Sequence, residues 1–100
     1  MNKQTTFLKV TVLQTDIVWE DAVANRKRIE KLVEGQEDTD LFVLPEMFST
    51  GFSMNPVEIA EKEEGETLQW MRRMAEEHRC ALAGSLSVSE SGMFYNRFYF

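Results

Sequence analysis

The sequence is poor in the residue types that build disulfide frameworks, metal sites and nucleic-acid surfaces. Its 100 residues include one cysteine and one histidine, and 11 basic residues stand against 17 acidic ones for a net charge of -6. A single cysteine excludes an internal disulfide, and no Cys-x-x-Cys or His-x-x-x-His spacing suggests a metal site. Because the negative charge opposes binding to a phosphate backbone, nucleic acid is not an expected partner.

Long hydrophobic runs are also missing. No apolar stretch approaches the roughly 18 residues of a membrane span, so we expect no membrane association and a cytoplasmic protein. Hydrophobic residues make up 43% of the chain and charged residues 28%, which is typical of a folded globular protein. At 100 residues the chain has room for one small domain and no second one.

The first half of the chain has the pattern of a βαβ unit. Alternating apolar and polar residues predict a strand over residues 8–14 with one buried face. Four apolar residues at helical spacing predict a helix over residues 20–34, which Gly35 ends: Ala22, Ile29, Leu32 and Val33. Four consecutive apolar residues over 41–44 predict a strand buried on both faces. A right-handed crossover would make these two strands parallel.

The second half adds a helix and a hairpin. Residues 55–60 favour a short helical turn, and the apolar stripe of residues 67–79 predicts a full helix. A strand over 80–88, a turn at 89–92 and an aromatic strand over 94–100 predict an antiparallel pair. The order β-α-β-α-β-β therefore indicates the α/β class with a mixed sheet.

Glu46 is the strongest candidate for a functional residue. Pro45 cannot donate to a sheet, so it ends the strand over 41–44 and leaves Glu46 at the carboxyl end. Clefts of open α/β sheets lie at such strand ends. A carboxyl group walled by Phe48 and Phe52 would be shielded from water and therefore more basic, as a general base requires. The alternative is a solvated loop carboxylate or a helix cap.

The other candidates each have a structural explanation beside a functional one. Phe48, Thr50 and Phe52 could line a substrate pocket or pack the loop after Glu46. Cys80 has the position of a small buried hydrophobe rather than of a reactive thiol. Asn96 could hydrogen-bond within the hairpin or orient a neighbour of the site. A run of acids is expected to be solvated: Glu58, Glu61, Glu63, Glu64 and Glu66.

Several separated segments resemble the nitrilase (carbon-nitrogen hydrolase) superfamily. They are Lys9 to Gln14, Leu44-Pro45-Glu46, Gly65-Glu66-Thr67, Gly84-Ser85 and Tyr95-Asn96-Arg97. The loop from Glu46 to Met54 is most similar to the omega-amidase branch. The resemblance implies that residues 1–100 are the N-terminal portion of a single domain with a four-layer αββα sandwich.

The resemblance also implies a Glu-Lys-Cys catalytic group that hydrolyses non-peptide C-N bonds. Glu46 matches the general base, whereas the oxyanion-binding lysine and the cysteine nucleophile are expected beyond Phe100. The 100-residue chain alone is therefore expected to be inactive. The full-length protein would need no cofactor, act on a small-molecule amide such as 2-oxoglutaramate, and form a homodimer.

Two alternatives remain open. A different reaction of the same family would hydrolyse another amide, a nitrile or an N-carbamoyl group. The chain could instead be a noncatalytic fragment or interaction module, because the sequence stops inside the aromatic strand that ends at Phe100. Such a strand would leave half of a sandwich face exposed for a partner.

Overall fold

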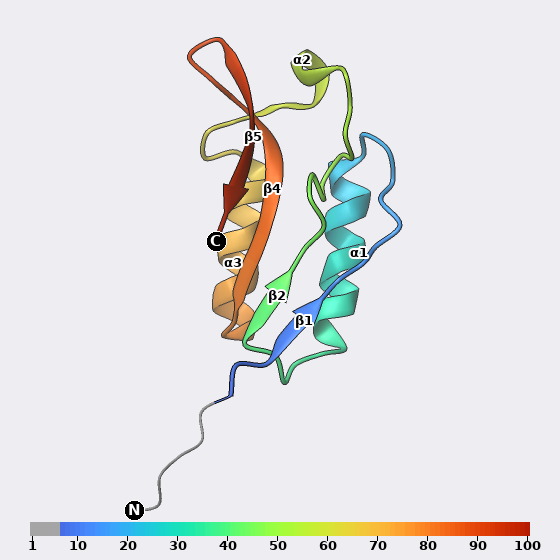
Figure 1. Cartoon of the computed structure of the whole chain (residues 1–100), viewed down its shortest axis with the longest axis vertical. Helices are drawn as coiled ribbons and strands as arrows, with labels where there is room; N and C mark the ends of the chain where they lie inside the picture. The colour runs from blue at the N-terminus through green and yellow to red at the C-terminus, as the bar shows by residue number, and fades with distance from the viewer. Residues whose placement is uncertain (1–6) are drawn as a thin grey trace, which may run out of the picture.

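The computed structural model describes residues 7–100 and arranges them around one five-stranded sheet (Figure 1). The strands are β1 (Val10–Val12), β2 (Leu41–Val43), β3 (Glu61–Lys62), β4 (Ala81–Glu90) and β5 (Met93–Tyr99). Strand β2 lies between β1 and β4 and is parallel to both, and β3 is parallel to the far end of β4. Strand β5 pairs antiparallel with β4. The predicted α/β class and the mixed sheet are confirmed; residues 1–6 of the predicted domain lie outside the described part.

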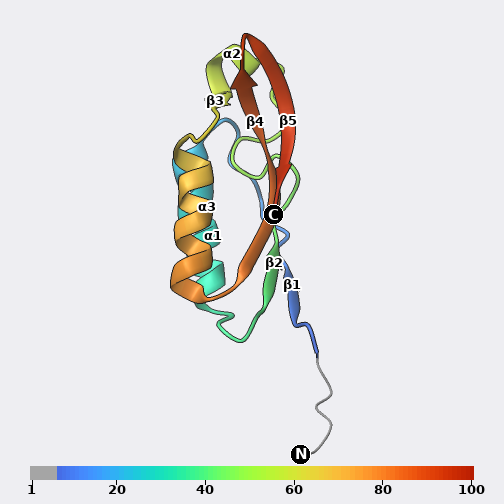
Figure 2. The same cartoon turned by 90° about the vertical axis from the view of Figure 1, so that its left-hand side faces the viewer.

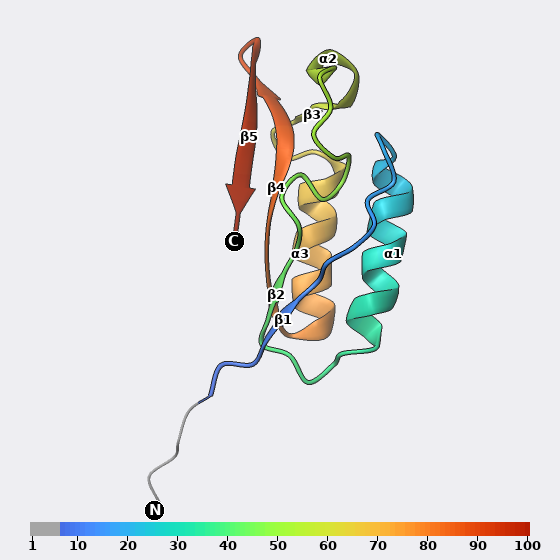
Figure 3. The same cartoon turned by 45° about the vertical axis from the view of Figure 1, so that its right-hand side comes forward.

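Helices cover one face of this sheet. They are α1 (Ala22–Glu34) and α3 (Glu66–His78), whereas the single turn α2 (Pro56–Ile59) buries no residue. Figure 2 shows α1 and α3 on the same face, one in front of the other, while the opposite face carries no helix, and Figure 3 shows the two helices side by side. None of the helices within residues 7–100 is long and apolar enough to cross a membrane. The four-layer sandwich stays a prediction.

Helix α1 differs from its predicted stripe at one position. Asp21 caps the helix, since its carboxylate accepts the backbone N–H of Ala24 at 3.0 Å. Ile29 and Val33 are buried as expected, but Leu32 is 41% exposed. The buried face continues at four-residue spacing to Asn25, which is only 2% exposed.

The first turn of helix α3 is bound by Glu61, an acid that was expected to be solvated. The cap position is Gly65, and the backbone N–H of Thr67 donates to Glu61 at 2.8 Å. The Thr67 hydroxyl also bonds Glu61, and Arg26 lies 3.9 Å from the same carboxylate. Glu61 is therefore not part of a solvated run. It belongs to β3, a strand of two charged residues that no hydrophobic pattern in the sequence predicts.

The predicted burial of the first strand is wrong. Val10 and Val12 are 47% and 70% exposed, because the helices cover the other face of the sheet. Leu13, one residue past the strand, is the position that turns inward and is buried. The core therefore lies between the sheet and the two long helices, where Trp70 packs on Phe48 with ring centroids 5.9 Å apart.

Candidate active site

The turn that carries Glu46 follows directly from β2, as the sequence predicts. Leu44 extends the pairing with β4 by one hydrogen bond of 2.8 Å to the carbonyl of Ala83, and Pro45 then ends it. Met47 adopts a positive φ of 53°, and its carbonyl accepts the N–H of Gly51 at 2.8 Å. This tight turn fixes Glu46 at the carboxyl end of the strand.

Two residues from the next strands hold this turn in place. Ser85 of β4 accepts the backbone N–H of Met47 at 2.9 Å through its buried hydroxyl. Asn96 of β5 donates from its amide nitrogen to the Glu46 carboxylate oxygen Oε2 at 2.9 Å. The backbone after Glu46 and its side chain are therefore bound to different strands of the hairpin.

These side chains share the face of the sheet that has no helix. In the β4–β5 register Ser85 lies opposite Phe98, and Ser87 lies opposite Asn96. Side chains alternate along a strand, and Leu86, between the two serines, belongs to the core on the helix side. Leu44, Glu46, Ser85 and Phe98 line a cavity of about 270 Å³ on the opposite side.

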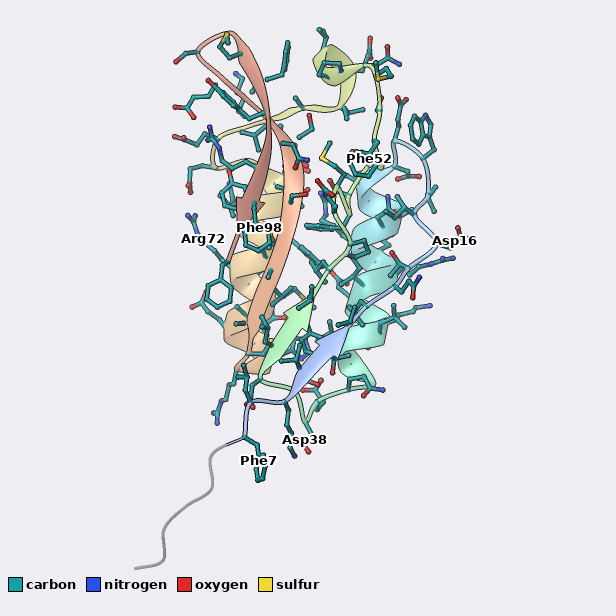
Figure 4. The ribbon with its side chains drawn as sticks, viewed as in Figure 1. Phe7, Asp16, Asp38, Phe52, Arg72 and Phe98 are labelled. Atoms are coloured by element: carbon teal, nitrogen blue, oxygen red, sulfur yellow. The ribbon has the colours of Figure 1, made fainter. Side chains whose placement is uncertain are left out.

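The aromatic wall predicted around Glu46 is absent from the described chain. Phe48 is fully buried in the core, Phe52 is 61% exposed on the loop, and the Glu46 side chain is itself exposed. The reason is the turn at Met47, which directs Phe48 toward Trp70 and away from the carboxylate. Figure 4 shows Phe52 on the loop after β2 and Phe98 over β5.

The predicted substrate-binding residues do not line the Glu46 cavity. Thr50 is 4% exposed, and its hydroxyl donates to the carbonyl of Gly51 at 3.0 Å. Phe48 packs against Trp70 in the core, and Phe52 is exposed on the loop. A role of Phe48, Thr50 and Phe52 in substrate binding stays a prediction, and the structure brings Phe98 and Asn96 to the carboxylate instead.

Asn25 supports the site and has no functional assignment from the sequence. Its amide nitrogen donates to the carbonyl of Ser49 at 2.7 Å and to that of Val18 at 2.8 Å. Its side-chain oxygen accepts the N–H of Val18 at 2.7 Å. The signal available in the sequence was its spacing, four residues before Ile29 on the buried helix face. A polar residue there must have partners inside the protein.

Gly84 lets β4 approach the same turn. A Cβ atom at this position would lie 2.9 Å from the ring of Phe48 and 3.1 Å from the Cβ of Leu44. These two residues flank the Pro45–Glu46 step, so the missing side chain is a condition for the observed packing.

Cys80 lies apart from Glu46. It lines a separate cavity of about 510 Å³ between α3 and the β4–β5 hairpin. Burial raises the pKa of the Cys80 thiol, and the nearby negative charge of Glu37 raises it further. Within residues 7–100, no lysine or cysteine lines the Glu46 cavity, and no three residues of the metal-binding types come together as a ligand group.

Comparison with known proteins points to one family. The carbon-nitrogen hydrolase family model matches residues 9–100. The chain is 40% identical over 91 residues to the omega-amidase YafV of Yersinia enterocolitica, covering 91% of this chain and 35% of that protein. It is 30% identical over 93 residues to the 2-oxoglutaramate amidase of Bacillus subtilis, covering 90% of this chain and 36% of that enzyme.

A solved structure agrees with the sequence matches. A CN-hydrolase superfamily protein of Xanthomonas campestris, solved with an arsenic adduct in its active site, superposes with a TM-score of 0.85 at 32% sequence identity. The match covers 91% of this chain and 35% of that protein, so the chain spans little more than a third of the relatives it resembles. Because the family model matches nearly the whole sequence, the chain belongs to the carbon-nitrogen hydrolase family.

Proposed function

We propose that the full-length protein is an amidase that releases ammonia from the terminal amide of a small 2-oxo dicarboxylic acid monoamide such as 2-oxoglutaramate. The observation that carries this proposal is the position of Glu46 in a chain of this family. Its carboxylate stands at the carboxyl end of β2 and opens into a cavity of about 270 Å³. The names of the similar omega-amidase and 2-oxoglutaramate amidase support the substrate class.

In this proposal Glu46 is the general base. It takes the proton of a cysteine thiol, and the resulting thiolate attacks the amide carbon while a lysine stabilises the oxyanion. The proton then leaves with ammonia, and a thioester remains. Glu46 next takes a proton from water, whose oxygen attacks the thioester and releases the acid and the thiol. From the family resemblance we expect this lysine and this cysteine to follow residue 100.

The same proposal makes this chain the N-terminal portion of one hydrolase domain. Val12 and Phe98 leave apolar surface on the helix-free face, being 70% and 65% exposed. Apolar surface of this extent is normally covered, and further strands of a sandwich would cover it. The homodimer and the absence of a cofactor remain proposals drawn from the family resemblance.

Two other functions compete with this one. Family members could act on another amide, a nitrile or an N-carbamoyl group, and the geometry around Glu46 serves any of these reactions. In the interaction-module hypothesis, a partner protein covers the same exposed face that further strands of a sandwich would cover. The hydrogen bond from Asn96 to the Glu46 carboxylate favours an enzyme, because a docking surface gives no reason to orient one acid.

The substrate class is tested by measuring ammonia release from a panel of compounds with the full-length protein. We expect kcat/KM for 2-oxoglutaramate to exceed that for glutamine by about a hundredfold or more, because a site built for the oxo acid rejects an analogue with a charged amine. Glutamine is the matched control, since it carries the same terminal amide. A preference for an N-carbamoyl amino acid or a nitrile would contradict the substrate assignment.

A further inference from the structure

Asn96 is an exposed residue of β5 whose side chain has a specific partner. Its amide nitrogen lies 2.9 Å from Oε2 of Glu46, 50 residues earlier in the chain. The backbone on either side is already held by the antiparallel pairing of β4 with β5, which runs from Met93 to Tyr99. The side-chain bond is therefore not needed to form the hairpin.

The surroundings of Glu46 offer little else to orient its carboxylate. The other residues lining its cavity are Leu44, Ser85 and Phe98, of which none carries a charge. The hydroxyl of Ser85 is engaged with the N–H of Met47. The charged neighbour on β5, Arg97, contacts Glu63 and Glu90 instead. Within residues 7–100, the hydrogen bond to the Glu46 carboxylate comes from Asn96.

We propose that Asn96 is a positioning residue for Glu46, and this inference rests on the proposed function. Its amide holds Oε2 and leaves Oε1 as the oxygen that accepts the proton. An exposed glutamate without such a bond samples several rotamers. The bond therefore raises the fraction of molecules in which the carboxylate is oriented to accept the proton. A neutral donor suits this role, because it orients the carboxylate without the full charge of an arginine or lysine.

Ser85 completes the arrangement from the neighbouring strand. It holds the backbone directly after Glu46, whereas Asn96 holds the end of the side chain. Strands β4 and β5 are paired, so both anchors belong to one rigid hairpin. The carboxylate is fixed relative to the sheet even though it lies in an exposed turn.

The test compares Asn96→Leu and Asn96→Asp with the unchanged full-length enzyme. Leucine has a similar size and no donor, and aspartate replaces the donor with a second acid. We expect kcat to fall about tenfold to a hundredfold in both variants, with KM changing much less. The low-pH limb of kcat/KM should move to higher pH with aspartate, since a like charge beside the carboxylate opposes its ionisation.

Three controls separate this inference from its alternatives. Asn55→Leu removes another amide-carboxylate contact, 3.5 Å from Glu20, and should leave both readouts unchanged. Circular dichroism and Tm check that each variant folds. The leucine variant tests the fall in kcat, and the aspartate variant tests both the fall in kcat and the pH shift. Glu46→Gln tests the proposed function itself: if it keeps full activity, the general-base role fails whatever Asn96 does.

The inference is overturned if Glu46→Gln is inactive while both Asn96 variants keep the normal kcat and pH profile. It is also overturned if kcat falls in Asn96→Asp without any movement of the low-pH limb, because that result describes a structural role.

Discussion

Glu46 and Cys80 occupy different environments within the same sheet. The Glu46 carboxylate is exposed, bound by Asn96 and open to a cavity on the helix-free face. Cys80 directly precedes β4 and is half-buried in the cavity between α3 and the β4–β5 hairpin. A nucleophilic cysteine needs surroundings that favour its thiolate. Burial and the charge of Glu37 do the reverse here, so this thiol is not suited to catalysis.

Cys80 should therefore alkylate slowly. Because its pKa is raised, the thiolate fraction at neutral pH is lower than in an unfolded peptide, and the rate should increase only as the pH approaches the raised pKa. We expect the second-order rate with iodoacetamide at neutral pH to lie below that of the same protein in urea. Cys80→Ser in the full-length enzyme should keep its amidase activity. Rapid alkylation of the folded protein, or loss of activity in Cys80→Ser, would contradict this interpretation.

At the residue scale, local signals predicted the acid but not its partners. An apolar run ended by Pro45 is enough to place Glu46 at a strand end. Its contact with Asn96 depends on the register of a hairpin 50 residues away, and its exposure depends on the positive φ of Met47. Neither quantity has a local signature in the sequence. The same holds for the bond between Asn25 and the carbonyl of Ser49.

Among the elements, β4 has the most connections and carries the residues that shape the site. It pairs with β2 over its first residues, with β3 near its end and with β5 over most of its length. Gly84 and Ser85 stand where the pairing with β2 gives way to the turn of Glu46. The small residue permits close packing, and the serine supplies a hydrogen bond to the backbone.

Gly84→Ala should destabilise the protein by about 1–3 kcal/mol, because the added methyl group would lie 2.9 Å from the ring of Phe48. Urea unfolding at equilibrium measures this loss. Gly35→Ala is the matched control: its Cβ would meet nothing closer than 3.6 Å, and its φ of -81° suits alanine. The control should change the free energy of unfolding by less than about 1 kcal/mol. Equal stability of Gly84→Ala and the unchanged protein would show that β4 does not pack tightly against Phe48 at this position.

The elements with a clear sequence pattern were predicted well, including the short turn α2 and the apolar strand β2, whereas β3 was missed. Helix α3 and the β4–β5 hairpin appear within a residue or two of their predicted bounds. Strand β3 went unrecognised because two charged residues carry no strand pattern, and the capping role of Glu61 was hidden in an acidic run. For β1, the alternation correctly predicted a strand but not which of its faces is buried. That depends on which side of the whole sheet the helices cover.

At the scale of the molecule, the helix-free face of the sheet carries both the candidate site and exposed apolar side chains. Val12 and Phe98 are exposed on this face, and Phe98 also lines the Glu46 cavity. Residues that cover this face in the full-length protein would therefore also close the space above the carboxylate. In the proposed mechanism the described chain would supply the base and its supports, and the rest of the protein would supply the thiol and the lysine.

The most direct test is ammonia release from 2-oxoglutaramate by the full-length protein, its Glu46→Gln variant and the 100-residue chain alone. Glu58→Gln, in the exposed helix α2, is the matched control and should keep normal activity. We predict that Glu46→Gln lowers kcat by about a hundredfold to ten-thousandfold, since the amide cannot accept the thiol proton, and that the 100-residue chain is inactive. Normal ammonia release by Glu46→Gln would contradict the account, because the reaction would then proceed without this base.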